Sequence, residues 1–344
     1  MVRYGARQQG ILLALCLYAA PRAAVLDVGN QRGRAAYRKT DRSIAMKIFI
    51  TGATGFVGSN LAKSLVHAGH RVIAVSRSEP QQRVDPDTYH FIAADTTRSG
   101  PWQRELADAD AVVNLAGASI FKRWTKKYKK QIYDSRILTT RNVVDALPSE
   151  TDIVLCSASG SGYYGNRKDD ILKEDERAGS DFLAGVSIDW EREALLASAK
   201  GARVAVMRFG VILGKNGGAM AKLIPAFKMF VGGPLGDGKQ WFPWLHLDDL
   251  MAAIEFVLDH QEVNGPLNFC APNPVRNREL AHALGEVLGR PSAMPAPAFM
   301  IRLAMGEFGD VFLGSQRAVP AKLLNHGFSF QYPEIRGAIR AIVA

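Results

Sequence analysis

The stretch Thr51-Gly-Ala-Thr-Gly-Phe-Val-Gly58 decides the fold of this chain, because its three glycines stand between two regular elements. The apolar run 46–51 before it predicts a β-strand, and residues 56–68 after it carry apolar side chains at helical spacing. In such a unit the glycines permit a tight turn, a close approach to a pyrophosphate and helix–strand packing. The stretch therefore predicts a dinucleotide site at the helix N-terminus. Its predicted contacts are Gly52, Thr54, Gly55, Phe56, Val57 and Gly58.

Strands and helices alternate along the chain after this stretch. We predict further strands at 71–76, 91–94, 111–115, 153–156 and 203–208, with the clearest helices at 126–147 and 188–200. This alternation predicts an α/β fold with a Rossmann-type doubly wound parallel sheet and a smaller C-terminal lobe. Glycine-rich loops at 214–218 and 232–238 are expected to cover the substrate side.

The chain of 344 residues has room for one such domain and an appended lobe. We divide it into a targeting leader (1–45), an NADP-binding Rossmann domain (46–215), substrate-side loops with the remaining α/β elements (216–290) and a C-terminal helical lobe (291–344). A turn-rich break at 289–297 marks the last boundary.

The first 45 residues have the composition of a targeting leader. The apolar run 11–20 follows Arg3 and Arg7, as in a signal peptide, and is too short to span a bilayer. Residues 25–45 are rich in arginine, which is typical of a transit peptide. The two together resemble the presequences of algal complex plastids, so a plastid location is favoured. The alternative is a true start at Met46 and a cytoplasmic or mitochondrial protein.

The net charge of +10 does not indicate a nucleic-acid-binding protein. Eight basic and two acidic side chains precede Met46, so most of the excess lies in the leader. The basic cluster 122–130 is predicted to be an exposed helix face that could add positive field near a cofactor's phosphates. No transmembrane segment is expected in the mature protein, and peripheral membrane association stays open.

The three cysteines, Cys16, Cys156 and Cys270, lack the spacing of a zinc site or a disulfide framework, so buried reduced thiols are expected. His246 beside Asp248 and Asp249 admits a catalytic dyad or a metal site. We instead expect Asp248 to cap a helix over 250–258, and we predict no metal.

The second strand indicates which dinucleotide is bound. An NAD site usually has an acidic residue about 20 positions after the glycines, which accepts the ribose hydroxyls. This chain has Ser76 and Arg77 there, and these groups suit a 2′-phosphate. NADP(H) is therefore the predicted cofactor, although Arg77 could be only a solvated cation.

Further motifs resemble those of extended short-chain dehydrogenase/reductases, and more narrowly their atypical "epimerase family protein" subgroup. The superfamily motifs are Asn114-Leu-Ala-Gly117, Ser157-Ala-Ser159, Tyr163-Tyr-Gly165, Arg208-Phe-Gly-Val-Ile-Leu-Gly214 and His246-Leu-Asp-Asp-Leu250. Those of the subgroup are Arg123-Trp124, Ser135-Arg136, Asp189-Trp-Glu191, Gly217-Gly-Ala-Met220, Gly232-Gly-Pro-Leu-Gly236 and Gln240-Trp-Phe-Pro-Trp244. The resemblance covers residues 46–344.

The resemblance implies further cofactor contacts. Leu115 and Ala116 would lie along the adenosine and pyrophosphate, and Asp95 would approach the adenine. Gln131 and Arg136 would bind the cofactor from the helix after the basic cluster. Val211 and Ile212 match the segment whose backbone lines the nicotinamide. Ordinary sheet packing is the alternative for Leu115, Ala116 and Ile212.

The superfamily's proton-transfer pair, Tyr-x-x-x-Lys, is missing here. Leu183 and Ser187 occupy the tyrosine and lysine positions. Ser159 matches the superfamily's serine, and Tyr163 is the better tyrosine candidate because Tyr164 matches a packing residue. We therefore take Ser159 and Tyr163 as the candidate catalytic residues.

Two functions remain open. The first is an NADP(H)-dependent oxidoreductase or epimerase that acts on an unidentified small molecule, with the aromatic residues Trp241, Phe242 and Trp244 as candidate pocket walls or core. The second is a catalytically reduced NADP(H)-binding protein with a regulatory or structural role, which the resemblance links to plastid division. Neither the substrate, the reaction direction nor the oligomeric state follows from the sequence.

Overall fold

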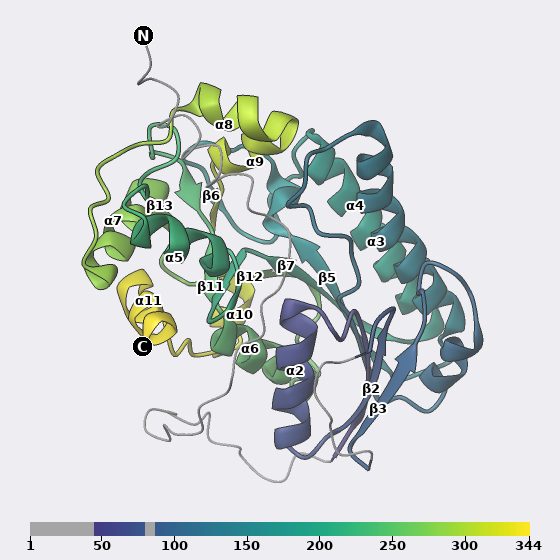
Figure 1. Ribbon diagram of the computed structural model, residues 1–344. Helices are drawn as coiled ribbons and strands as arrows, with labels where there is room; N and C mark the ends of the chain where they lie inside the picture. The colour runs from purple at the N-terminus through teal and green to yellow at the C-terminus, as the bar shows by residue number, and fades with distance from the viewer. Residues whose placement is uncertain (1–44, 80–86) are drawn as a thin grey trace.

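A seven-stranded parallel sheet forms the centre of the molecule (Figure 1). The computed structural model describes residues 45–79 and 87–344. The strand order is β12-β7-β5-β4-β1-β2-β3. From β1 the chain adds β2 and β3 on one side and then continues with β4 on the other side, as in a doubly wound sheet. The predicted Rossmann-type fold is confirmed. The strands are β1 (Lys47–Thr51), β2 (Arg71–Ser76), β3 (Tyr89–Ala93), β4 (Ala111–Asn114), β5 (Val154–Gly160), β7 (Arg203–Phe209) and β12 (Gly265–Phe269).

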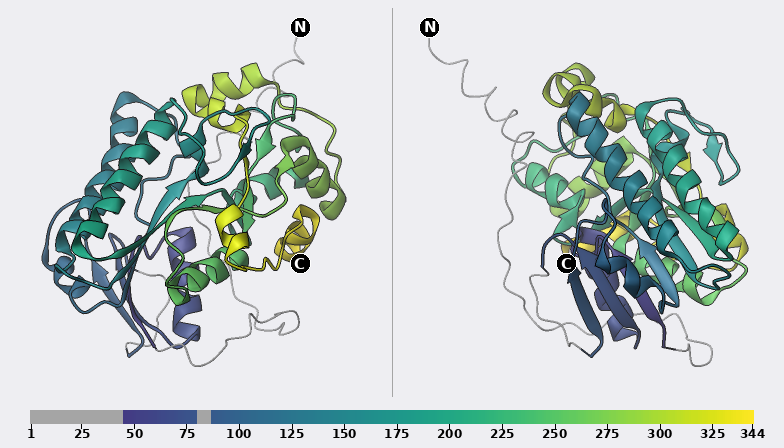
Figure 2. Two further views of the ribbon diagram at one scale, coloured as in Figure 1. Left: turned by 180° about the vertical axis from the view of Figure 1, so that it is seen from behind. Right: turned by 90° about the vertical axis from the view of Figure 1, so that its right-hand side faces the viewer.

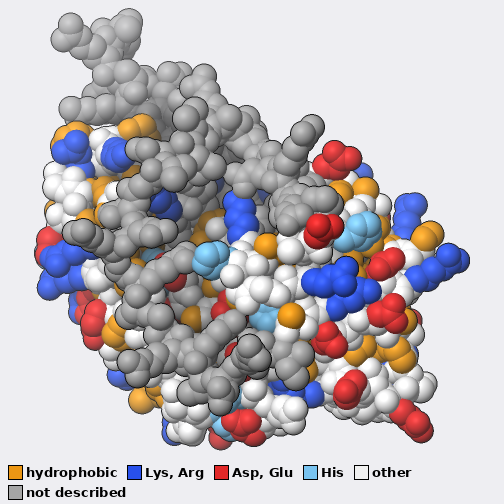
Figure 3. Space-filling view, turned by 90° about the horizontal axis from the view of Figure 1, so that it is seen from below, with side chains coloured by type: hydrophobic (Ala, Val, Ile, Leu, Met, Phe, Trp, Pro, Cys, Tyr) orange, Lys and Arg blue, Asp and Glu red, His pale blue; other side chains and the backbone are white. Residues whose placement is uncertain are grey.

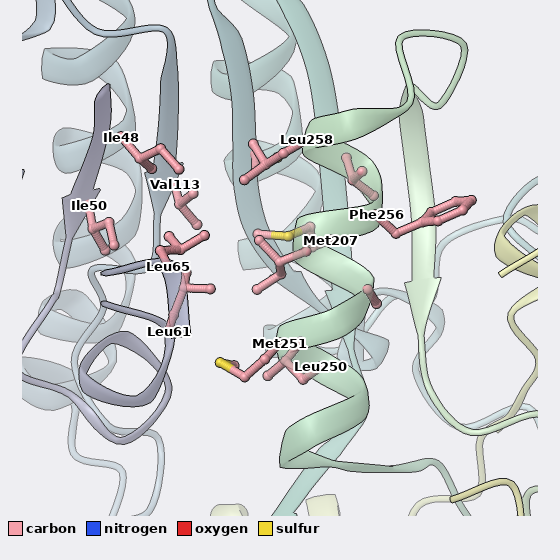
Figure 4. Close-up of a cluster of buried hydrophobic side chains, with 14 of the residues drawn as sticks. Ile48, Ile50, Leu61, Leu65, Val113, Met207, Leu250, Met251, Phe256 and Leu258 are labelled. Atoms are coloured by element: carbon pink, nitrogen blue, oxygen red, sulfur yellow. The ribbon is translucent and has the colours of Figure 1, made fainter. Parts of the chain in front are cut away.

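Helices cover both faces of this sheet. Helices α2 (Phe56–His67) and α6 (Leu247–Asp259) pack on one face, where Leu61 and Met251 belong to one core with Ile50 of β1 (Figure 4). Helices α3 (Lys126–Ala146) and α4 (Phe182–Leu195) lie side by side on the other face (Figure 2), in a core with Phe49. Because successive strand residues point to opposite faces and both faces are covered, the three central residues of β1, Ile48, Phe49 and Ile50, are all apolar and buried.

A third, smaller core lies beside the end of the sheet. It joins α5 (Met220–Lys228), α7 (Asn277–Leu288) and α11 (Ile335–Val343) with β8 (Val211–Gly214), β11 (Trp244–His246) and β13 (Val275–Arg276). Segments 216–290 and 291–344, which the sequence led us to separate, therefore share one core. Segment 216–290 also supplies β12 to the main sheet.

The C-terminal segment is not wholly helical. Between α9 (Gly309–Leu313) and α10 (Ala321–Asn325), the strand β14 (Arg317–Ala318) pairs in parallel with β6 (Ile171–Leu172). The helix α8 (Ala298–Met305) precedes α9 and the short turn η4 (Gly306–Phe308). The strand β14 ties this segment back to the first domain, an arrangement that a run of two residues could not predict.

Most predicted element boundaries agree with the structure within a few residues, and α4 is the main exception. It begins at Phe182 rather than at 188, because the side chain of Asp181 accepts a hydrogen bond from the Ala184 amide at 3.0 Å and caps the helix. Residues 196–200 form the 3₁₀ turn η3 (Leu196–Lys200).

Cys156 and Cys270 are buried free thiols, as expected, and Cys16 lies outside the described residues.

Within residues 45–79 and 87–344, none of the helices is both long and apolar enough to cross a bilayer. The same residues contain no His, Cys, Asp and Glu group that could hold a metal. On the face seen in Figure 3, basic and acidic side chains are interspersed outside the grey residues.

Candidate functional site

The glycine loop between β1 and α2 is a cradle that larger residues would fill. Gly52 has a φ of +69°, and a Cβ there would lie 3.0 Å from the backbone of Ala116. A Cβ on Gly58 would lie only 2.4 Å from the carbonyl oxygen of Gly52. The loop can adopt this shape only with glycine at both positions.

The first turn of α2 presents unused hydrogen-bond donors at this cradle. The N-cap Gly55 has no side chain to cap the helix. Among the described residues, no group accepts a hydrogen bond from the amides of Phe56, Val57 or Gly58. Such amides, together with the helix dipole, form a site for an anion such as a pyrophosphate.

A buried chain of polar side chains holds the cradle from beneath. The Thr51 hydroxyl donates to Asn114 Oδ1 at 2.7 Å, and Asn114 Nδ2 donates to the Thr140 hydroxyl at 2.8 Å. The Thr51 oxygen also accepts from the amides of Leu115 and Ala116, at 3.1 and 3.2 Å. The last two residues therefore lie beside the glycine loop, with their amides already bonded within the protein.

Ser76, Arg77 and Asp95 lie at the carboxyl edge of β2 and β3. The hydroxyls of Thr54 and Ser76 are 2.7 Å apart, which joins the glycine loop to the end of β2. Arg77 and Asp95 are both exposed. Loss of some solvent around the Asp95 carboxyl tends to raise its pKa. Hydrogen bonds from Thr97 and the charges of Arg77 and Arg98 outweigh this effect, so the pKa of Asp95 is lowered.

Arg136 brings a cation without a carboxylate partner to the loop after β4. Its guanidinium donates to the carbonyls of Ala118 and Ile132, at 3.1 and 3.0 Å, and lies against Gly117. No ion pair joins it to an acidic side chain in the part of the chain that the structure describes. Burial lowers the pKa of this guanidinium to about 10. Gln131 is exposed one and a half turns earlier on α3.

The strand that carries Ile212 is held against the start of α2. Ile212 pairs with Leu245 of β11, and a Cβ on Gly217 would lie 2.1 Å from the ring of Phe56. Glycines in β8 and β9 (Gly217–Gly218) thus make room for the Phe56 ring. The structure brings the predicted residues Phe56 and Ile212 to one edge of the sheet.

Ser159 belongs to a buried ion-pair network. Its hydroxyl donates to Glu191 Oε1 at 2.7 Å, and Arg208 binds both oxygens of Glu191 at 2.9 and 2.8 Å. Ser159, Glu191 and Arg208 are each at most 5% exposed. Burial tends to lower the pKa of Arg208, but the hydrogen bonds to Glu191 and its charge outweigh burial, so this pKa is raised. The one hydroxyl hydrogen of Ser159 is therefore engaged in a hydrogen bond to Glu191.

The two adjacent tyrosines differ in their surroundings. The Tyr163 ring is stacked against Arg208, with 3.5 Å between the ring centre and Cζ, and it is only partly buried. Tyr164 is fully buried, and its hydroxyl donates to Asn268 Oδ1 at 2.7 Å. Burial raises the pKa of Tyr164, so this phenol stays protonated.

Leu183 and Ser187, which the sequence assigns to the positions of the missing acid–base pair, lie in the first two turns of α4. Leu183 lines a cleft of about 440 Å³ beside Gly162 and Phe182, at the carboxyl end of β5. Ser187 is buried. This cleft, which we call the Leu183 cleft, is the cavity beside the missing tyrosine.

The interpretation of Asp248 as a helix cap is wrong. Helix α6 begins at Leu247, and the N-cap is His246, whose Nδ1 accepts from the Asp248 amide at 3.1 Å. Because this nitrogen already accepts a backbone bond, His246 forms no dyad through it with Asp248, whose carboxylate is 3.8 Å away. Asp249 is buried and accepts from the amides of Gln331 and Tyr332, at 2.6 and 3.0 Å. His246 and Asp249 thus hold main-chain groups in place.

The aromatic residues and the basic cluster have mixed environments. Trp244 is fully buried in the smaller core, whereas Trp241 lies between the guanidiniums of Arg276 and Arg317.

In the basic cluster, Lys129 binds Glu307 of η4 at 2.6 Å. This contact spans 178 positions of sequence, so local pattern gave no signal for it.

Comparison with known proteins identifies the family. The model of the NAD dependent epimerase/dehydratase family matches residues 48–270, and that of a domain of unknown function matches residues 296–342. A chloroplastic homologue of epimerase family protein SDR39U1 from Arabidopsis thaliana is 41% identical over 302 residues, covering 87% of each chain. An epimerase family protein of Staphylococcus haemolyticus is 38% identical, covering 87% of this chain and 99% of its own.

Solved structures agree with this result. Human epimerase family protein SDR39U1, crystallised with NADPH, has a TM-score of 0.76 and 31% identity over 86% of this chain and 99% of its own. A nucleoside-diphosphate sugar epimerase from Corynebacterium glutamicum has a TM-score of 0.70 and 32% identity, over 87% of this chain and 58% of its own. The second structure matches along only part of its length.

Proposed function

Because this chain belongs to the NAD dependent epimerase/dehydratase family, we propose that it binds NADP(H) and acts as an oxidoreductase or epimerase on a small molecule. The observation that carries the proposal is the cradle at Gly52 and Gly58, whose free amides lie at the switch point of the sheet. The unpaired guanidinium of Arg136 lies at the neighbouring loop and would find its anion in the cofactor.

The preference for NADP(H) over NAD(H) rests on the end of β2. Ser76 and Arg77 stand where a carboxylate would repel a 2′-phosphate. The human relative crystallised with NADPH is 31% identical to this chain, which supports the same choice. Neighbours solved with NAD, such as MoeE5, are only 21–22% identical and support the fold alone.

A bound nicotinamide would supply hydride transfer, and the chain's own residues would position it and handle protons. The remaining predicted contacts, Thr54, Phe56, Val57, Asp95, Leu115, Ala116, Gln131 and Ile212, are proposed to surround the same molecule. For proton transfer we propose Ser159 and Tyr163, because the Ser159 hydroxyl is hydrogen-bonded to a carboxylate, that of Glu191, and the Tyr163 ring lies on Arg208.

The second candidate, an NADP(H)-binding protein with a regulatory or structural role, is favoured by a specific observation. Leu183 and Ser187 cannot replace the Tyr-x-x-x-Lys pair, and the Ser159 proton is already donated to Glu191. A protein that retains the cradle but has lost the acid–base pair would bind the cofactor without turning it over. For either function we propose a chloroplast location, which the chloroplastic relative supports.

A thermal-shift titration with NADPH and NADH tests the cofactor, since a ligand raises the melting temperature by mass action. We expect NADPH to stabilise the protein at about tenfold lower concentration than NADH, because Arg77 would pair with the 2′-phosphate. Equal shifts would remove the specificity, and no shift with either would remove the proposed function. Substrate-dependent oxidation of NADPH that Ser159→Ala and Tyr163→Phe abolish would select the enzyme over the regulatory protein.

The variant Arg136→Met tests the cradle itself. Burying an unpaired cation is costly, so the apolar residue is expected to leave the ligand-free melting temperature equal or higher. NADPH affinity is expected to fall about tenfold or more, because a charge-assisted bond is lost. Arg192→Ala, which removes an exposed arginine paired with Asp189, is the matched control and should change neither quantity. Parallel loss of stability and affinity would show that Arg136 is only a packing residue.

A further inference from the structure

The walls of the Leu183 cleft come from two parts of the chain. Gly162, Phe182 and Leu183 belong to the dinucleotide-binding domain, at the carboxyl end of β5 and the start of α4. Arg302 and Asp310, from α8 and α9, face them from the C-terminal segment. A molecule in this cleft would therefore lie at the edge of the sheet where ligands of doubly wound folds bind.

Aromatic rings on one wall already hold a cation. Trp124 and Phe182 pack edge to face, with ring centres 5.1 Å apart, and both line the cleft. The ammonium of Lys129 lies 4.4 Å from the centre of the Phe182 ring and 5.9 Å from that of Trp124. The faces of such rings attract positive charge and stack on planar apolar groups.

The charges around the cleft leave an excess of negative charge. Its acidic residues are Asp181, Glu307 and Asp310, and its basic lining residue is Arg302. Arg302 pairs with Asp310 at 2.8 Å, and Lys129 pairs with Glu307 at 2.6 Å. Asp181 has no ion pair among the described residues; one of its oxygens caps α4. Arg302 and Lys129 are thus each matched by a carboxylate, whereas the lining carboxylate of Asp181 is not.

From this arrangement we infer that the Leu183 cleft takes a small neutral or positively charged molecule with a planar apolar part, and excludes nucleoside diphosphate sugars. A diphosphate carries negative charge that sites in proteins meet with arginine or lysine. Among the lining residues of this cleft, the one cation, Arg302, is already paired, and the unmatched carboxylate of Asp181 repels a diphosphate. The inference rests on the proposed function, because it names the substrate class of that site.

Binding of matched probes to the NADPH-saturated protein tests the inference. Tyramine, tyrosol and 4-hydroxyphenylacetate share one phenol ring and carry a positive, a neutral and a negative end. By titration followed with ligand-detected NMR, we expect tyramine to bind about tenfold more tightly than 4-hydroxyphenylacetate, with tyrosol between them. The difference should shrink at high salt, because these charges are exposed to solvent. UDP-glucose should show no saturable binding in the millimolar range.

The double variant Glu307→Gln/Asp310→Asn reverses the charge balance of the cleft. It frees Lys129 and Arg302 from their carboxylates, so 4-hydroxyphenylacetate is expected to bind more tightly than tyramine. Glu105→Gln/Asp108→Asn is the matched control, because it removes the same charge from the carboxylates beside Lys47 at the opposite edge of the sheet. The control should keep the wild-type order of the three probes.

Three results would overturn the inference: equal or absent binding of the phenol probes, the same order in both double variants, or saturable binding of UDP-glucose that Trp124→Ala abolishes. Each titration is repeated without NADPH, and NADPH binding is measured in the same samples by its fluorescence. Loss of NADPH binding with the probe order intact would contradict the proposed function alone. Normal NADPH binding with the wrong probe order would contradict the charge selection of the cleft alone.

Discussion

At the scale of single residues, the backbone rather than the side chains shapes the cofactor cradle. Gly52 and Gly58 are needed because other atoms of the main chain occupy the places where their Cβ atoms would lie. Beneath them, Thr51 uses one hydroxyl to bond Asn114 and two main-chain amides. The loop is thus fixed before any ligand arrives, and binding need not order it.

Gly58→Ala should damage both the fold and the cradle. The added methyl would lie 2.4 Å from the Gly52 carbonyl oxygen, so the loop or the helix must move. We expect the free energy of unfolding to fall by about 1–3 kcal/mol and NADPH binding to weaken, as measured by urea denaturation and by titration. Gly337→Ala, in helix α11 with no atom within 4 Å of the new methyl, should instead stabilise by about 0.5–1 kcal/mol. Similar effects of both substitutions would contradict the crowding at Gly58.

The sequence predicted the cradle better than the proton-transfer groups. The glycine pattern is local, so Gly52 to Gly58 could be assigned from their spacing alone. Ser159 was assigned by motif, but its partner depends on how α4 packs against β5 and β7, which brings Glu191 and Arg208 to it. A carboxylate 32 positions away leaves no periodic signal for such a contact.

At the scale of secondary-structure elements, prediction and structure differ at the N-caps of two helices, α4 and α6. Asp181 caps α4, which begins six residues before the predicted start, and His246 caps α6 where the sequence favoured Asp248. Aspartate is the commoner N-cap, but Asp248 lies within the first turn and Asp249 binds the amides of residues 331 and 332. Which of His246, Asp248 and Asp249 caps α6 depends on where the C-terminal segment packs, because that segment supplies the amides that Asp249 binds.

The cap at His246 should make stability depend on pH. Burial, opposed by the charge of Asp248, lowers the pKa of His246 below its usual value of 6.5. Below that pH the unfolded state binds more protons at this site than the folded state, so the free energy of unfolding falls with acidification. Protonation also removes the nitrogen that accepts the Asp248 amide. Thermal unfolding from pH 7 to pH 5 should therefore cost the wild type more than His246→Asn, which caps without titrating. A parallel pH dependence of the two proteins would exclude this residue as the cause.

At the scale of the whole molecule, the C-terminal segment completes the first domain instead of standing apart. Helix α11 shares a core with α7, β14 pairs with β6, and Lys129 bonds to Glu307. Asp249 of α6 binds the backbone that leads into α11. A turn-rich break marked this segment as a lobe, and the pairing of distant elements joins it to the rest of the chain. The same pairing closes the Leu183 cleft, whose walls come from both parts.

This shared core predicts a single unfolding transition for the folded chain. Ile339 is fully buried in α11, and Ile339→Ala should lower the free energy of unfolding by about 2–5 kcal/mol. Because Asp249 of α6 binds the backbone before α11, and α6 packs on the main sheet, circular dichroism and tryptophan fluorescence should report the same shifted midpoint in urea. Leu303→Ala, at a side chain 84% exposed on α8, is the control and should change stability by at most about 0.5 kcal/mol. Two separate transitions, of which Ile339→Ala moved only one, would instead show that the C-terminal segment folds as an independent domain.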